Sequence, residues 1–381
     1  MHKRKILILS YSNLSSDPRI SKQIAALKDS FQIETCAYNA CGIETLKFYP
    51  IYKEPEVSFR RKFKRLFQLL SKQFDNFYWD DGRQKLREQL CRENYDLIIA
   101  NDIQTLPLAL DISMNKGKVY FDAHEYHPRE FEDLLKWKLL YQQYISFLCK
   151  KYIPKASAFS TVTDTIANAY KEFTGANAIV INNMSYYHDL VPSELNAEKI
   201  KMVHHGAAMR SRKLERMIKM MDFTDERFSL DLILTGNDPS YVIQLKKFAK
   251  KNSRIRFIDP VDANNVCKYT NLYDLGIFLL PPTNYNYLNA LPNKIFDFIQ
   301  ARLGSVISPN PEMKALVETH HLGIISPDYT PESMALEINK LTPQKIIQFK
   351  KNAALAAKKL TAEENINKIR KIVSELLQLP T

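Results

Sequence analysis

The sequence predicts an α/β protein made of two consecutive open domains, each a parallel sheet covered by helices. Short apolar strands alternate with amphipathic helices along the chain, which is the pattern of parallel sheets covered on both faces. The length of 381 residues favours two domains. The alternation pauses once, at a polar stretch over residues 185–198 that contains Pro192 and lacks strong periodicity. We expect this stretch to link the domains.

The first half begins with a buried strand at residues 5–11 and a helix from Pro18 to about residue 28. Asp17 is the expected N-cap of this helix, and proline suits its first position because no partner exists there for an amide hydrogen. The other elements expected in this half are a helix at 103–114 and strands at 95–101, 118–123, 158–162 and 178–182.

The second half repeats the alternation and ends in a helix at residues 361–379. We therefore expect a first domain at 1–185, a second at 199–358, and a closing segment, 359–381, that packs back toward the first domain. Open α/β sheets bind ligands at the carboxyl ends of their strands, so the expected site is the cleft between the two sheets. The strands expected here are 201–205, 230–235, 254–258, 274–280 and 305–308.

Composition excludes several classes of protein. With 45% hydrophobic and 25% charged residues, the chain is not disordered, collagen-like or a small disulfide-stapled protein. None of the nine glycines forms a G-x-G, which excludes an ordinary dinucleotide-binding turn and a P-loop. The five cysteines include no C-x-x-C, so we expect reduced thiols in a cytoplasmic chain, with Cys36 and Cys41 in a turn rather than on zinc. Neither a secretory signal nor a spanning segment is recognisable.

The charge of +12 is partly concentrated in a basic aromatic helical segment at residues 59–79. Its first half carries five cations between apolar residues at helical spacing. Such a helix can lie on an anionic membrane, giving peripheral attachment to the inner face of the cell membrane. Alternatively its apolar face packs on the first sheet, which we favour for half of the segment. No RNP, helix-turn-helix or zinc-finger signature accompanies the charge, so we expect no nucleic acid partner.

The turn after the strand at 118–123 is rich in imidazole and carboxylate groups. Asp122, His124, Glu125 and His127 could be mistaken for metal ligands, but their spacing is not H-E-x-x-H and no helix places both histidines on one face. We expect no metal and a hydrogen-bonding role for His124. A histidine satisfied by Asp122 or Glu125 within its own turn explains the same residues.

A cationic turn follows the first strand of the second half. That strand ends at Gly206, and Arg210, Arg212 and Lys213 are expected to open the next helix. Backbone N–H groups, the helix dipole and mobile cations would then converge on one anion, as in a diphosphate site. A solvated basic helix start is the alternative.

A helix start at residues 289–299 is expected to point into the cleft, with Pro292 near its beginning. Asp297 lies between Phe296 and Phe298, and a carboxylate placed there is costly to desolvate unless it is paired. A ribose diol offers it two donors. Alternatively, the acid faces solvent and interacts with the helix dipole.

At these segments the chain resembles the retaining family-four glycosyltransferases of the GT-B fold, which have two Rossmann-like domains facing each other across a cleft. The resemblance spans nearly the whole chain. The matching stretches are the helix start Asp17-Pro18-Arg19, DAHE from Asp122, ASAFSTVTDTIANAYKEF from Ala156, AIVINN from Ala178, HGAAMRSRKLE from His205, LPNKIFDFIQARLGSVIS from Leu291 and LTAEENINKI from Leu360.

The resemblance implies transfer of a sugar from a nucleoside-diphosphate sugar to a glycan or lipid-linked acceptor in envelope polysaccharide or lipopolysaccharide synthesis. His124 matches the histidine near the C6 hydroxyl of the donor sugar. Lys213 matches the lysine that neutralises the leaving diphosphate, with Arg210 or Arg212 as its helper, and Asp297 matches the acid that holds the ribose. Further substrate-binding positions are Glu125, Gly206, Asn289, Asn293 and Lys294.

Three departures from the family pattern bear on activity. Asn289 stands where the first glutamate of the E-x7-E motif usually contacts the sugar, and Ala207 stands where an arginine often follows the phosphate turn. The turn at residues 11–16 lacks the usual glycines. A sugar-nucleotide epimerase or hydrolase of the same fold, or a non-catalytic binding protein, therefore remains an alternative.

Fixed cations aimed at the departing phosphate would do what Mg²⁺ does in other transferases, and the chain has no D-x-D motif. We therefore expect neither a metal nor another cofactor. The resemblance implies transfer with retention, in which the leaving phosphate helps to deprotonate the acceptor hydroxyl.

Overall fold

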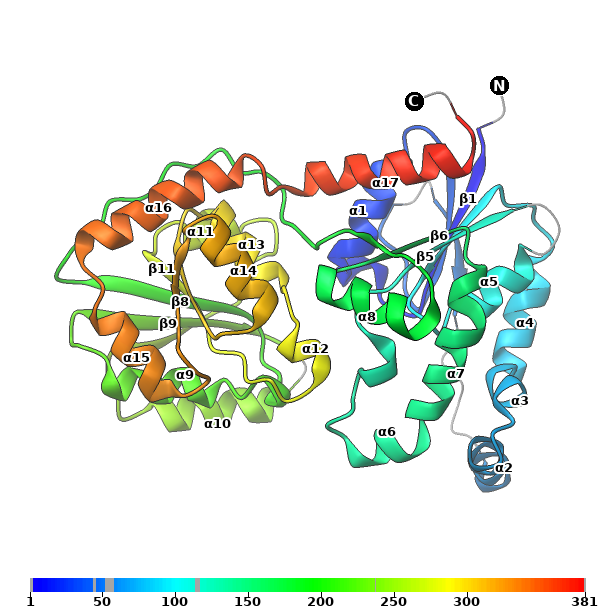
Figure 1. The fold of residues 1–381 in the computed structure, drawn as a ribbon, viewed down its shortest axis with the longest axis horizontal. Coiled ribbons are helices and arrows are strands. Elements are labelled where there is room, and N and C mark those ends of the chain that lie inside the picture. The colour runs from blue at the N-terminus through cyan, green and yellow to red at the C-terminus, as the bar shows by residue number, and fades with distance from the viewer. Residues whose placement is uncertain (1–2, 44–45, 52–57, 114–116, 237, 380–381) are drawn as a thin grey trace. The chain divides into compact units, whose positions relative to one another are not determined.

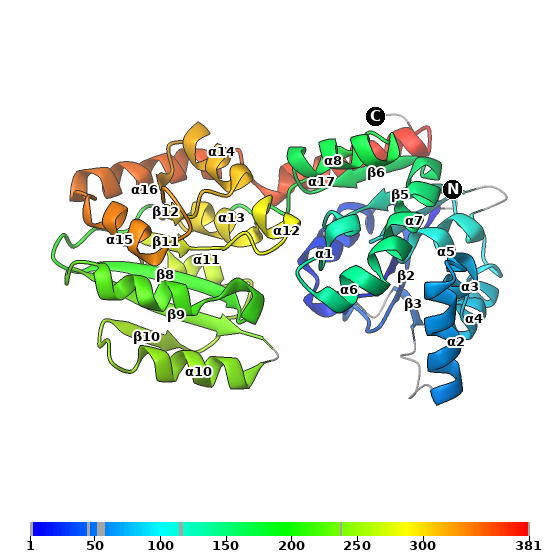
Figure 2. The ribbon, with the colours of Figure 1, turned by 60° about the horizontal axis from the view of Figure 1, so that its bottom comes forward.

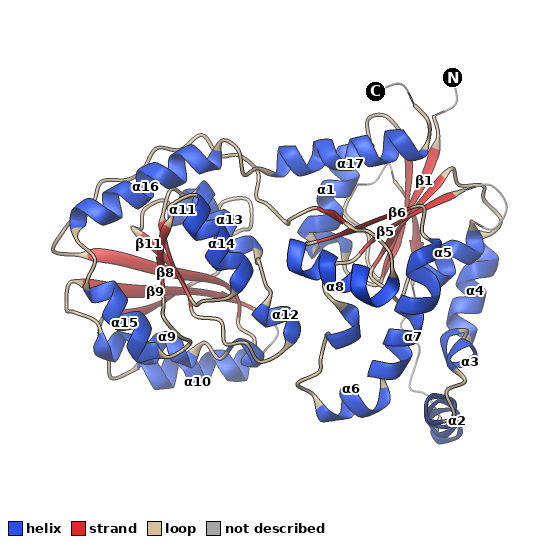
Figure 3. Cartoon of the chain, viewed as in Figure 1, coloured by secondary structure: helices blue, strands red, loops and turns tan. Residues whose placement is uncertain are grey.

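The computed structural model describes residues 3–43, 46–51, 58–113, 117–236 and 238–379. The chain divides into two compact units, unit 1 at 1–182 with 365–381 and unit 2 at 183–364. Each unit is a parallel sheet with helices around it (Figure 1; Figure 3). The predicted α/β class with two successive sheets is confirmed.

The described residues of unit 1 form a parallel sheet in the order β3-β2-β1-β4-β5-β6-β7. Its register aligns Ser10, Asn101, Asp122 and Ser160 in one row across four neighbouring strands, at their carboxyl ends. All four residues are buried, so the row forms the floor of a polar cluster. The strands are β1 Lys5–Ser10, β2 Gln32–Ala37, β3 Lys47–Pro50, β4 Leu97–Asn101, β5 Lys118–Asp122, β6 Ala158–Thr161 and β7 Ile179–Val180.

Helix α1 begins as the sequence predicts, because the Asp17 side chain accepts hydrogen bonds from the backbone N–H groups of Arg19 and Ile20. The predicted helix at 103–114 is shorter, and its last expected residue lies outside the described ranges. The helices of unit 1 are α1 Pro18–Leu27, α2 Phe59–Leu70, α3 Phe74–Tyr78, α4 Asp81–Leu90, α5 Leu106–Ile112, α6 Leu135–Leu140, α7 Gln142–Tyr152 and α8 Asp164–Thr174, together with most of α17 Ala362–Leu376.

The closing helix α17 lies on unit 1 beside α1 (Figure 1). Its residues Ile366, Ile369 and Val373 belong to the same buried cluster as Ile20 and Ile24 of α1. A second attachment is polar, since Arg370 Nε donates to the backbone carbonyl of Ala26 at 2.9 Å.

The described part of unit 2 is a parallel sheet in the order β10-β9-β8-β11-β12-β13. Its strands are β8 Ile200–Ala207, β9 Phe228–Thr235, β10 Ile255–Ile258, β11 Leu275–Phe278, β12 Gly304–Ile307 and β13 Gly323–Ile325. Its helices are α9 Glu215–Met220, α10 Pro239–Ala249, α11 Val266–Thr270, α12 Tyr285–Leu288, α13 Asn293–Gln300, α14 Pro311–Thr319, α15 Pro331–Asn339 and α16 Pro343–Ala357.

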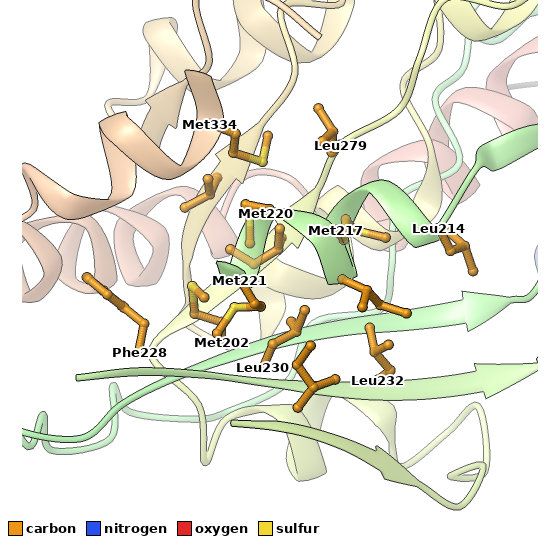
Figure 4. Close-up of a cluster of buried hydrophobic side chains, with 14 of the residues drawn as sticks. Met202, Leu214, Met217, Met220, Met221, Phe228, Leu230, Leu232, Leu279 and Met334 are labelled. Carbon is orange, nitrogen blue, oxygen red and sulfur yellow. The ribbon is translucent and has the colours of Figure 1, made fainter. Parts of the chain in front are cut away.

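A separate hydrophobic cluster covers each face of this sheet. One cluster is rich in methionine, whose flexible side chains fill irregular spaces between β8, β9, α9 and α15 (Figure 4). On the other face α13 packs closely on β11. A Cβ at Gly276 would lie only 2.3 Å from the ring of Phe298, so only glycine leaves room for this ring. This close contact holds the middle of α13 against this face of the sheet.

Two expectations about the chain are wrong. Cys36 is a buried residue of β2 rather than part of a turn, and β2 escaped notice because its centre contains the polar Glu34 and Thr35. The stretch at 185–198 is not a free linker: Arg302 donates to the carbonyl groups of His188 (2.5 Å) and Leu190 (3.1 Å), which ties the stretch to unit 2.

Candidate functional site

Asp122 is the centre of the polar cluster in unit 1. Its buried carboxylate accepts a bidentate pair of hydrogen bonds from Arg19, at 2.6 and 2.5 Å, and further bonds from Gln23 (2.8 Å) and Ser160 (2.5 Å). Burial alone would raise the pKa of Asp122, but the Arg19 guanidinium outweighs it and holds the pKa well below its usual range. Asp122 is therefore a fixed negative charge.

His124 lies over this cluster, with 21% of its side chain exposed. Its Nε2 lies 3.3 Å from Oδ1 of Asn101 and 3.6 Å from Asp122, and its Nδ1 lies 3.7 Å from Asp102. Burial lowers the pKa of His124, but the two carboxylates outweigh it and raise the pKa above its usual value. The imidazole is held by its own turn and by the neighbouring strand end.

Asp102 is a site residue that motif reading missed. It follows β4 with φ of 67°, a left-handed conformation that is uncommon for a residue other than glycine. Its carboxylate accepts a hydrogen bond from the backbone N–H of His124 at 3.4 Å. Burial raises the pKa of Asp102, but His124 and His127 outweigh burial and lower the pKa to about 2. The sequence signal that could have identified Asp102 is its position directly after the strand β4, next to the strand β5 that ends at Asp122.

Glu125 and His127, the other acid and histidine of this turn, differ from His124 in exposure and in their hydrogen-bond partners. Glu125 is exposed, and its backbone carbonyl accepts a hydrogen bond from Tyr170 Oη at 2.7 Å. His127 is buried, and its Nδ1 lies 2.9 Å from Glu130. His127 is therefore part of the packing beneath the turn.

In unit 2, Lys294 lies beneath the turn at the end of β8. Gly206 has φ of 119°, and a Cβ there would lie 3.4 Å from Nζ of Lys294. The buried Nζ is 3.2 Å from Nε2 of His204 and 4.0 Å from the centre of the Phe278 ring. Since Nδ1 of His204 donates to the carbonyl of Ile277 (2.9 Å), its Nε2 is free to accept from Lys294.

Lys294 is buried without a carboxylate hydrogen-bond partner among the residues that the structure describes. Burial, with a smaller contribution from Arg212, lowers the pKa of Lys294 well below its usual value, although the charge of Asp297 opposes this shift. Burial and the nearby Lys294 likewise lower the pKa of His204. An anion at the Gly206 turn would favour the charged amine, because an opposite charge offsets the cost of desolvation.

The three cations after β8 do not open a helix as expected. Arg210 to Arg212 form a 3-10 turn, Lys213 is left-handed with φ of 48°, and α9 starts only at Glu215. Arg212 donates to the carbonyl of Ala207 at 3.2 Å and stays beside the Gly206 turn. Lys213 is exposed and forms no ion pair within the described ranges.

Arg210 is directed toward the start of α10. Its guanidinium donates to Asp238 (2.7 Å), Gln244 (2.8 Å) and Ser240 (2.9 Å), and it lies 4.9 Å from the centre of the Tyr241 ring. These contacts engage all three nitrogens of the guanidinium. Of the two arginines considered as helper to Lys213, Arg212 is the one that the structure leaves near the Gly206 turn.

Asp297 in α13 faces other side chains rather than open solvent. Its Oδ1 accepts from the Ser185 hydroxyl and lies 3.8 Å from Sγ of Cys267. Its Oδ2 lies 3.6 Å from Nε2 of His205, a buried atom without a hydrogen-bond partner in the described part of the chain. Burial lowers the pKa of His205 to about 4, although Asp297 opposes this shift. His205 is thus neutral near pH 7.

The two asparagines considered as substrate contacts differ in exposure. Asn289 is buried, and its amide donates to the carbonyl of Tyr285 at 2.9 Å, which closes α12. Asn293 is half-buried at the first position of α13, next to Lys294.

Within the described ranges, no group of three or more His, Cys, Asp or Glu side chains could hold a metal ion. In the same ranges, none of the helices is both long enough and apolar enough to cross a lipid bilayer.

No protein-family model matches the chain, and no curated protein sequence matches it. Solved structures do match. Anabaena HepE in complex with UDP-glucose is 15% identical, with a TM-score of 0.72 over 97% of this chain and 99% of its own. The sucrose-phosphate synthase of Thermosynechococcus elongatus is 12% identical, with a TM-score of 0.75 over 99% of this chain and 100% of its own. WaaG, a glycosyltransferase involved in lipopolysaccharide biosynthesis, is 10% identical, with a TM-score of 0.63 over 97% of this chain and 99% of its own. The chain therefore has the GT-B fold of these proteins, with two Rossmann-like domains.

Proposed function

We propose that the protein is a glycosyltransferase that moves a sugar from a nucleoside-diphosphate sugar to a glycan or lipid-linked acceptor. The observation that carries this proposal is the buried Lys294 amine beneath the Gly206 turn. A buried amine without a carboxylate hydrogen-bond partner is costly to charge, and a ligand phosphate would supply a directly bonded negative charge. The UDP-glucose bound to HepE, a protein of the same fold, agrees with a ligand of this class.

The Gly206 turn suits a diphosphate for steric reasons as well. With no Cβ at Gly206, an anion at this turn could approach the Lys294 amine closely. Arg212 adds a second positive charge beside the turn. Lys213, exposed and unpaired with any described acid, supplies a mobile third charge.

These cations would act on the reaction and not only on binding. When the glycosidic bond to the phosphate breaks, negative charge grows on the leaving diphosphate, and groups fixed around it stabilise the transition state more than the ground state. Lys294, Arg212 and Lys213 would perform this task without a metal. We propose transfer with retention, in which the leaving phosphate accepts the proton of the acceptor hydroxyl.

The assignments in unit 1 and α13 complete the proposal. His124, with its raised pKa, would donate a hydrogen bond to a hydroxyl of the donor sugar. Asp297 would accept hydrogen bonds from the ribose with the oxygen that faces His205. We further propose an acceptor in envelope polysaccharide synthesis and peripheral attachment to a membrane.

Incubation with a panel of nucleotide sugars, with and without membrane extract, tests the proposal. Release of a nucleoside diphosphate that depends on the extract supports a transferase. Consumption of donor without extract supports the epimerase or hydrolase alternative. Binding of a diphosphate with no turnover under either condition supports the non-catalytic alternative, and no binding of UDP, GDP or ADP refutes the proposed donor site.

A further inference from the structure

Helix α2 presents an apolar stripe that the described residues do not cover. At about 100° per residue, its five largest outward apolar side chains fall on one side of the helix. Their exposed fractions range from 40% to 82%, although residues of this type are normally buried. The stripe consists of Phe59, Phe63, Leu66, Phe67 and Leu70.

The opposite side of α2 is attached to the rest of unit 1. Arg65 pairs with Asp80 at 3.2 Å and lies 4.4 Å from the centre of the Phe77 ring. Arg61 pairs with the first residue of α4 at 3.4 Å, and Leu69 is buried. These contacts hold the helix with its stripe facing outward.

This arrangement divides the basic aromatic segment in two, as the sequence suggested. Phe74, Phe77 and Tyr78 of α3 are buried, so the second half packs against the protein. The first half does not, and its apolar face requires another partner.

The cations of α2 indicate what kind of partner that is. Arg60, Lys62 and Lys64 flank the stripe on both sides, are exposed, and form no ion pair with a described residue. No acidic residue occurs between Phe59 and Phe74. An apolar stripe bordered by cations is the pattern of a helix that lies in the interface of an anionic bilayer.

A second helix of unit 1 has the same character. None of the residues of α6 is buried, and Leu135 and Leu139 are 70% and 68% exposed beside the exposed Lys136 and Lys138. Both α2 and α6 lie on the side of unit 1 away from α17 (Figure 1; Figure 2).

We infer that α2 and α6 together form a docking surface for a bilayer with anionic headgroups, here named the α2–α6 surface. The cations would contact lipid phosphates while the apolar side chains enter the boundary between headgroups and acyl chains. A nucleic acid would use the cations but would leave the apolar stripe in water, so a bilayer fits both features. The docking surface names the partner in the proposed membrane attachment. Only the purpose of that attachment, access to a lipid-linked acceptor, rests on the proposed function.

Co-sedimentation with phosphatidylcholine vesicles, with and without phosphatidylglycerol, tests the surface. We expect binding to the anionic vesicles only, weakening with added salt. The triple variant R60Q/K62Q/K64Q should lose roughly fivefold in partitioning per cation removed. The pair F63S/F67S should also lose binding, whereas F248S, at a phenylalanine of unit 2 with 54% exposure against 56% for Phe67, should bind like the wild type.

Tryptophan fluorescence tests the contribution of α6. The chain contains two tryptophans, Trp79 and Trp137, and only Trp137 belongs to α6. In a W79F background, lipids with brominated acyl chains should quench Trp137, and L135S/L139S should remove the quenching. A Trp137 signal that bound vesicles leave unquenched would exclude α6 from the surface.

Three results would overturn the inference: no binding to anionic vesicles, equal loss of binding in F248S, or a salt-sensitive shift of generic DNA that depends on the α2 cations at physiological salt. Calorimetry with UDP, GDP and ADP on the same samples separates this inference from the proposed function. Lost vesicle binding with normal binding of one of these diphosphates contradicts only the docking surface. Normal vesicle binding with no binding of any of the three contradicts only the donor site.

Discussion

Replacing Lys294 with methionine tests the proposed phosphate contact directly. Methionine resembles the unbranched stem of lysine and suits the apolar surroundings near Phe278, so the change removes the charge without opening a large cavity. A hydrogen bond from an ammonium to a charged oxygen contributes about 1.5–3 kcal/mol. The Kd for the nucleoside diphosphate should therefore rise by roughly 10- to 150-fold.

Stability should respond in the opposite way. The wild type keeps this amine buried beside His204 without an acidic hydrogen-bond partner among the described residues, so the variant loses a desolvation cost. Its free energy of unfolding should stay equal or rise. Lys345→Met, at an exposed lysine of the same unit, is the matched control and should leave both quantities unchanged.

Proton uptake gives an independent measure of the same contact. In the free protein the pKa of Lys294 is well below its usual value because of burial, and a bound diphosphate would raise it. Binding then takes up a proton wherever the free amine is neutral, so affinity falls as pH rises through that range. Calorimetry in two buffers with different ionisation enthalpies counts the protons. A Lys294→Met protein with wild-type affinity and wild-type proton uptake would refute the assignment.

Four further outcomes are expected. Lys213→Ala should lower kcat/KM about a hundredfold or more with little change in stability, because an exposed cation acts on the transition state; unchanged turnover in steady-state kinetics contradicts this. Asp297→Ala should mainly weaken nucleotide binding, and unaltered affinity by calorimetry argues against the ribose contact. Asp102→Asn should lower the pKa of His124 by removing one of its two carboxylates; an NMR titration that shows no shift rejects that coupling. Burial lowers the pKa of His205 to about 4, so the free energy of unfolding should rise as pH increases from about 4 to about 6.5. Denaturant titrations of His205→Phe at several pH values should show a smaller rise than those of the wild type.

The elements that could be predicted are those whose signals are local. Asp17 followed by proline marks the start of α1, and the cap bonds to Arg19 and Ile20 confirm it. Strand β2 has no such signal, because Glu34 lies in its middle. The partners that make this buried acid tolerable are Lys5, Tyr49 and Tyr95, which come from other elements of unit 1.

The candidate site shows the same division between local and distant information. Residue type and strand ends were enough to single out His124 and Gly206 as candidates, and Lys294 came only with the resemblance to family-four glycosyltransferases. They could not show that Asp238 and its neighbours occupy Arg210, since that contact joins residues 28 positions apart. Nor could they show the left-handed backbone of Asp102, which depends on the packing of β4 beside β5.

The two polar clusters differ in the sign of charge that they favour, and this difference bears on mechanism. Around His124, two carboxylates raise the pKa of the imidazole, so that cluster favours positive charge. Around Lys294, burial and Arg212 lower the pKa of the amine, and Asp297 opposes this shift only in part, so that cluster disfavours positive charge. In sugar transfer from a nucleoside diphosphate, negative charge grows on the leaving phosphate. The buried Lys294 amine has no carboxylate hydrogen-bond partner among the described residues, so a bound phosphate would supply the charge that favours its protonated form.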